Sequence, residues 1–185
     1  MRWYNGAIAI TGALILAGCD RMPESSRSDA RQQQDATGSP LSVDVPVTSI
    51  GDKAYLREIS ALNHFLVEAS KIAVTESTTP EIQHFAERAI NDYQGMSNRL
   101  DETVGERADD TPILSSQADQ LDHLRNTSSG FDSAYVRELY DASKRIISLS
   151  RNYMTKGENA NLRDYAKLAG SLAQSRLQQI DELPV

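Results

Sequence analysis

The 185-residue chain has one cysteine and one tryptophan, and aromatic residues make up only 6% of it. A single cysteine excludes an internal disulfide and any zinc or iron–sulfur site that needs several thiolates. Basic residues are also in deficit, with 19 Lys and Arg against 26 Asp and Glu and a net charge of −7. Because a nucleic-acid-binding face needs an excess of positive charge, this composition argues against a nucleic-acid partner.

The chain also lacks the common catalytic motifs. It has no nucleophile elbow, no glycine-rich phosphate loop, no dinucleotide fingerprint and no metalloprotease histidine pair. Among the three histidines, one occurs in a Glu-x-x-His pattern, Glu81-Ile82-Gln83-His84, whereas a di-iron bundle needs two such pairs and two further carboxylates. Glu81 is better explained by the helix dipole, since it falls in the first turn of an expected helix. We therefore predict no catalytic residue, no metal and no cofactor.

Residues 1–18 have the features of a signal peptide. Arg2 is the only charged residue before Asp20, and residues 7–17 form an apolar run too short to span a bilayer. The run ends in Leu16-Ala17-Gly18-Cys19, which resembles the lipobox of bacterial lipoproteins, in which a leucine and two small residues precede the acylated cysteine. The resemblance implies cleavage before Cys19, lipidation of Cys19, and attachment to the periplasmic face of a membrane through acyl chains.

The alternative to lipidation is a plain secretory signal followed by an incidental cysteine. If Cys19 is acylated, the next residue bears on which membrane holds the protein. Asp20 resembles the inner-membrane retention signal of enteric bacteria, so we expect the inner membrane rather than the outer one.

A polar segment separates this leader from the rest of the chain. Residues 19–51 contain three of the six prolines and show no helical or strand period, which predicts a flexible tether between the lipid and a domain at 52–185. The alternation at 41–45 is that of a short strand, but no partner strand is evident.

From Tyr55 onward, apolar residues recur every three or four positions, which is the period of amphipathic helices. The pattern predicts four long helices and a short connector helix at 117–126, with breaks before Pro80, at Gly105, around Gly130 and at Gly157. Thr79 is expected to cap the second helix and Pro80 to occupy its first position. Four long helices without a sheet predict an all-α four-helix bundle, in which the first two and the last two long helices are antiparallel neighbours. The arrangement of the two hairpins is left open.

One charged residue interrupts the apolar stripe of the last helix. Arg176 falls where a leucine is expected, and a buried guanidinium needs a partner. Glu68, Asp92 and Asp141 are the candidate partners; alternatively, the side chain extends to a bundle end.

Several motifs of the helical region resemble a bacterial envelope family known as domain of unknown function 4142. The most specific is Gly130-Phe131-Asp132-Ser133-Ala134-Tyr135, and looser matches are Ile82-Gln83-His84-Phe85-Ala86 and Leu162-Arg163-Asp164-Tyr165-Ala166. The resemblance covers about residues 52–183. It implies a ferritin-like fold and brings no established activity.

The chain departs from that family at three positions. Members typically carry an Asp-His pair late in the second helix, a histidine about twelve residues after the Phe-Asp element, and a histidine in the last helix. The corresponding residues here are Tyr93, Ser143 and Arg176. We expect them to form a polar cluster in the core, and this combination of side chains makes a poor site for a transition metal.

Three functional hypotheses follow. The leading one is a lipid-anchored periplasmic bundle that acts without catalysis, as an interaction or envelope-maintenance and stress module with an unidentified envelope partner. The second is a ferritin-like metal-binding or redox protein of the envelope that uses surviving carboxylates and His84. The third is a small-ligand carrier in which Arg176 holds an anion.

Overall fold

The computed structural model describes residues 49–105 and 112–185, all within one compact unit, Ser42–Val185. Cys19, the predicted signal peptide, the tether up to residue 48 and the alternation at 41–45 lie outside the described residues. The described part is all-α and contains five helices: α1 (Ile50–Glu76), α2 (Pro80–Val104), α3 (Ser115–Asn126), α4 (Phe131–Lys156) and α5 (Ala160–Ile180). None of these helices is long and apolar enough to cross a membrane.

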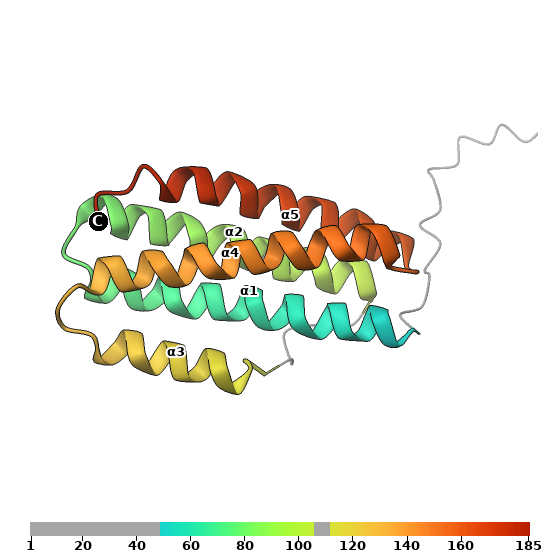
Figure 1. Ribbon diagram of the computed structural model, residues 1–185, viewed down its shortest axis with the longest axis horizontal. Coiled ribbons are helices and arrows are strands. Elements are labelled where there is room, and N and C mark those ends of the chain that lie inside the picture. The colour runs from blue at the N-terminus through green and yellow to red at the C-terminus, as the bar shows by residue number, and fades with distance from the viewer. Residues whose placement is uncertain (1–48, 106–111) are drawn as a thin grey trace, which may run out of the picture. The chain divides into compact units, whose positions relative to one another are not determined.

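The four long helices form a bundle in which each contacts two neighbours. The hairpins α1–α2 and α4–α5 pack together through α1 against α4 and α2 against α5, while α3 lies outside against α1 and α4 (Figure 1). The chain returns along the bundle through α3, so α4 begins at the end where α1 finishes, and every neighbouring pair of long helices is antiparallel. The helix types and hairpins are as predicted, and the structure resolves the arrangement that the sequence left open.

The helix boundaries follow local chemistry. The Ser49 hydroxyl accepts a hydrogen bond from the Asp52 backbone N–H at 3.0 Å and caps α1. Pro80 occupies the start of α2, and Gly105 ends that helix with φ +69°, a left-handed conformation that suits glycine. Thr79 occupies the N-cap position of α2 as predicted, but its hydroxyl donates to Asp132 Oδ2 at 2.5 Å and makes no capping hydrogen bond. This bond joins the starts of α2 and α4.

The predicted apolar stripes fill the core. Most of their members are buried, and Met96, Leu149 and Leu183 are partly buried. The interior glycines differ from each other: a Cβ on Gly170 would lie 3.4 Å from Ser150 Cβ across the α4–α5 contact, whereas Gly95 faces open space. Gly170 therefore permits close packing of α4 against α5, whereas Gly95 lies on the surface, where packing does not require a glycine.

The turn between α4 and α5 depends on a glycine for space. Gly157 has φ −67°, which any residue adopts, but a Cβ there would lie 2.5 Å from Tyr153 Cζ. The tyrosine ring fills the position that a side chain would need, which makes Gly157 part of the packing at this end of the bundle.

Candidate functional site

The three positions at which the family resemblance implies histidine lie in the interior of the bundle. Tyr93 comes from α2, Ser143 from α4 and Arg176 from α5, and their exposed fractions are 2%, 1% and 3%. Burial raises the pKa of Tyr93 to about 12, although the nearby Ser143 hydroxyl and the Arg176 charge both act to lower it. Ser143 and Arg176 therefore both lie near Tyr93 in the core, and the three are called the buried cluster below.

Arg176 on α5 forms an ion pair with Asp92 on α2. Its Nη2 donates to Asp92 Oδ2, its Nη1 donates to Gln179 Oε1 at 2.9 Å, and its guanidinium carbon lies 5.1 Å from the centre of the Phe85 ring. Of the three candidate partners, the structure selects Asp92. Glu68 instead binds Lys71 at 2.7 Å.

Three polar atoms of the cluster lack a hydrogen-bond partner: Tyr93 Oη, Ser143 Oγ and Arg176 Nε. The Tyr93 and Ser143 hydroxyls influence each other without reaching hydrogen-bonding geometry. Each buried polar atom left unbonded costs about 1–3 kcal/mol, so packing elsewhere must offset this cluster.

The chemistry available to the cluster is narrow. A phenol with a pKa near 12 stays neutral at pH 7, a serine without a base is a weak nucleophile, and a guanidinium stays protonated. No member of the cluster changes its protonation state near neutrality, so the three residues do not form an acid–base pair. They offer hydrogen bonds and one positive charge, which the Asp92 carboxylate already balances.

Two further hydrogen bonds cross the interior. The Tyr135 and Ser70 hydroxyls are 3.0 Å apart, and Asn63 Nδ2 donates to the Tyr165 hydroxyl at 2.8 Å. Burial is the main cause that raises the pKa of both tyrosines. The sequence analysis did not identify these two hydrogen bonds. The available indication was the seven-residue spacing of Asn63 and Ser70, which places both on one face of α1.

A second polar group, centred on Asp52, lies at the end of the bundle where α1 begins, α4 ends and α5 begins. Asp52 is 2% exposed and accepts hydrogen bonds from the Tyr153 hydroxyl and from the backbone N–H groups of Glu158 and Asn159, at 3.3 and 3.5 Å for the last two. Burial alone would raise the pKa of Asp52, but these bonds lower it below its ordinary value. Tyr55 stacks on Tyr153 with ring centres 4.0 Å apart. The sequence analysis missed this group.

The histidines do not join the cluster. His84 is mostly exposed, and its Nδ1 lies 3.4 Å from Glu87 Oε2, so the Glu81-x-x-His84 pattern points away from the interior. His123 is exposed and His64 is partly exposed. Within residues 49–105 and 112–185, no three His, Cys, Asp or Glu side chains are placed to hold a metal ion together.

Comparison with known proteins supports the family resemblance. No curated protein and no solved structure matches the chain. A family match covers residues 38–183, most of the chain, and begins inside the segment that we predict as tether. It includes the Phe-Asp-x-x-Tyr element at the start of α4 and all three residues of the buried cluster. The chain therefore belongs to the family described as Domain of unknown function (DUF4142).

Proposed function

We propose that this protein is a lipid-anchored helical bundle on the periplasmic face of a bacterial membrane, where it acts without catalysis as an interaction or envelope-maintenance and stress module. The observation that carries the non-enzymatic part is the Arg176–Asp92 ion pair. Arg176 occupies the interior position where family members typically carry histidine, and its guanidinium binds the Asp92 carboxylate. A cation at that place repels a metal ion, and Tyr93 and Ser143 stay neutral beside it.

The anchoring part of the proposal rests on residues 1–51. The lipobox-like Leu16-Ala17-Gly18-Cys19 predicts an acylated N-terminus, and two or more acyl chains give stable membrane attachment. The tether of about thirty residues that the sequence predicts would let the bundle range roughly 30 Å from the lipid surface. Asp20 favours the inner membrane.

Anchoring is tested by intact mass and by incorporation of labelled palmitate in a bacterial host. The expected mature chain begins at acylated Cys19 and lacks Trp3, so it contains no tryptophan, and Cys19→Ala abolishes labelling. A matched Ser26→Ala variant in the tether keeps full labelling. Retention of Trp3, or label that survives Cys19→Ala, would contradict the proposal.

The interaction role is tested by crosslinking in intact cells followed by affinity purification of the full chain. The expected result is a reproducible set of envelope proteins that requires the folded bundle. Recovery of no specific partner across several growth and stress conditions would count against an interaction module.

A ferritin-like metal-binding or redox protein is the second candidate, because one observation favours it. The long helices α2 and α4 are joined by one long crossover through α3, which is the connectivity of ferritin-like bundles. This supports the ferritin-like fold that the resemblance implies. Connectivity alone brings no chemistry, however, and the buried cluster offers no histidine and a single, already paired carboxylate.

A further inference from the structure

A groove of about 590 Å³, the α4–α5 groove, runs along α4 and is lined by an excess of positive charge; Leu177 is the lining residue that α5 contributes. Lys144, Arg151 and Lys156 line it, all three are exposed, and no carboxylate is among the lining residues. The chain as a whole is acidic, with a net charge of −7. Three further surface grooves of the described residues each include at least one carboxylate. The α4–α5 groove therefore carries positive charge on a protein whose net charge is negative.

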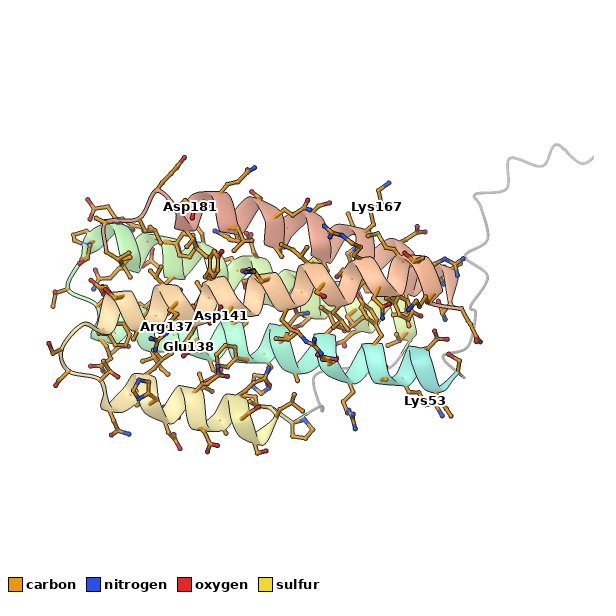
Figure 2. All side chains as sticks on the ribbon, in the orientation of Figure 1. Lys53, Arg137, Glu138, Asp141, Lys167 and Asp181 are labelled. Carbon is orange, nitrogen blue, oxygen red and sulfur yellow. The ribbon has the colours of Figure 1, made fainter. Side chains whose placement is uncertain are left out.

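These cations are not neutralised by the protein. In the described part of the chain no ion pair joins Lys144, Arg151 or Lys156 to a carboxylate, and Lys144 lies over the Tyr140 ring at 5.1 Å. Asp141, which Figure 2 labels on α4, is one turn before Lys144 in the sequence and is not among the residues that line the groove. By contrast, Arg145 on the same helix is paired with Glu58 of α1. The positive charge of the groove is thus available to an external anion.

The rest of the lining is uncharged and partly apolar. Ser148 and Asn152 contribute hydrogen-bond donors, whereas the Thr155 hydroxyl donates to the Arg151 carbonyl oxygen at 3.0 Å. The partly buried Ile147 and Leu177 contribute apolar surface. Met154 lies seven residues after Ile147, on the same side of α4, and its exposed fraction is 39%. A ligand that suits this surface carries both negative charge and hydrocarbon.

The spacing of the cations favours an extended anionic surface over a single small anion. Lys144 and Lys156 are separated by about 18 Å along the helix, and Arg151 lies between them. Hydrogen bonds to phosphate are about 3 Å long, so one phosphate ion is small compared with the length over which these cations are spread. A row of cations at this spacing matches a surface that carries many separate phosphates.

We propose that the α4–α5 groove docks on the surface of a membrane containing anionic phospholipid, with Lys144, Arg151 and Lys156 binding headgroup phosphates and Ile147, Leu177 and Met154 contacting the hydrocarbon boundary. The choice of a phospholipid surface over another amphiphilic polyanion rests on the proposed anchoring at Cys19, which holds the bundle near lipid. Docking would lay the bundle against the membrane that holds its anchor, with α4 and α5 facing the lipid.

The test uses the full chain in neutral-detergent micelles and measures its melting temperature after doping with phosphatidylglycerol, with phosphatidylcholine, or with inorganic phosphate in solution. We expect phosphatidylglycerol alone to raise the melting temperature, by about 3–5 °C at ten times its Kd, and high salt to remove the rise. The variant Lys144→Gln/Arg151→Gln/Lys156→Gln should lose the rise. The matched variant Lys53→Gln/Arg57→Gln/Lys167→Gln removes the same charge from exposed positions outside the groove and should keep it.

Four results would overturn the inference: no rise with phosphatidylglycerol, an equal rise with phosphatidylcholine, an equal rise with inorganic phosphate or a single-stranded oligonucleotide, or a rise that survives in the groove variant. The melting temperatures without lipid show that both variants fold. Palmitate labelling of Cys19 is scored separately. If the chain is not acylated but still responds to phosphatidylglycerol, the groove proposal holds and the anchoring proposal fails. If the chain is acylated but does not respond, the anchoring proposal holds and the groove proposal fails.

Discussion

The guanidinium of Arg176 on α5 is bound to the carboxylate of Asp92 on α2, and the two partners differ in their access to water. The Arg176 side chain is 3% exposed, whereas that of Asp92 is 43% exposed. Removal of Asp92 therefore leaves a buried charge without its partner, while removal of Arg176 leaves a carboxylate that water can solvate.

This asymmetry predicts opposite effects for two substitutions. Asp92→Asn should lower the free energy of unfolding by about 1–2 kcal/mol, since the remaining amide neutralises no charge. Arg176→Leu should leave that free energy unchanged or raise it by up to about 2 kcal/mol, because it also removes the unbonded Nε. Urea unfolding measures both. Arg145→Leu, which breaks the more exposed Arg145–Glu58 pair, is the control and should cost less than about 1 kcal/mol. A large loss for Arg176→Leu would show that the pair is a net stabiliser.

Two glycine variants test the packing of the bundle in opposite directions. Gly157→Ala should destabilise the protein by about 1–3 kcal/mol, because the added Cβ overlaps the Tyr153 ring. Gly95→Ala should stabilise it by about 0.5–1 kcal/mol, since Gly95 lies on an exposed face of α2 with open space around it. Thermal unfolding of the two variants side by side gives the comparison. Equal shifts of the melting temperature would refute the packing described for the α4–α5 turn.

The Asp52 group predicts a dependence of stability on acid. Its pKa in the folded protein is below the ordinary value, so its contribution is present above that ordinary value, near pH 4, and is lost as the pH falls through the folded pKa. Asp52→Asn should therefore be less stable than the parent at pH 7 and should lose less stability between pH 4 and pH 2. The exposed Asp164→Asn is the control and should keep the parental acid profile. Parallel profiles for the parent and Asp52→Asn would contradict this role.

The buried tyrosines predict the behaviour in alkali. Burial is the main cause that raises the pKa of Tyr55, Tyr93, Tyr135, Tyr153 and Tyr165. A raised pKa contributes stability that is present below the unfolded value, about pH 10, and is lost as the pH rises through the folded value. Tyrosinate absorbance and helical circular dichroism should therefore change together above pH 10. Titration of these tyrosines near pH 10 in a protein that keeps its helices would contradict their burial.

Periodicity predicted the helices, the hairpins and the buried stripes, because an amphipathic helix carries its core face in the sequence. Arg176 was located in advance by its place on an apolar stripe, and the family resemblance grouped it with Tyr93 and Ser143. The partner of Arg176 was not predicted, since Glu68, Asp92 and Asp141 all carry a carboxylate and only the register of α2 against α5 selects Asp92. The Asp52–Tyr153 contact joins residues 101 positions apart, and no local pattern encodes such a pair. At Thr79 the local sequence predicted the N-cap position correctly, but the hydroxyl donates to Asp132 on α4 and not to the backbone of α2.

The most direct test of the central claim is the metal content of the full chain and of the variant Tyr93→His/Ser143→His/Arg176→His, both purified without chelators and measured by elemental mass spectrometry. Melting temperatures with added iron, manganese and zinc accompany the measurement. If the Arg176–Asp92 pair has replaced a metal-binding centre, the parent chain holds no stoichiometric metal and does not respond to any of the three ions. The histidine variant, with Asp92 released, gains a bound metal and a higher melting temperature with it. Stoichiometric metal in the parent chain that raises its melting temperature would contradict the account and put the ferritin-like metal protein in its place.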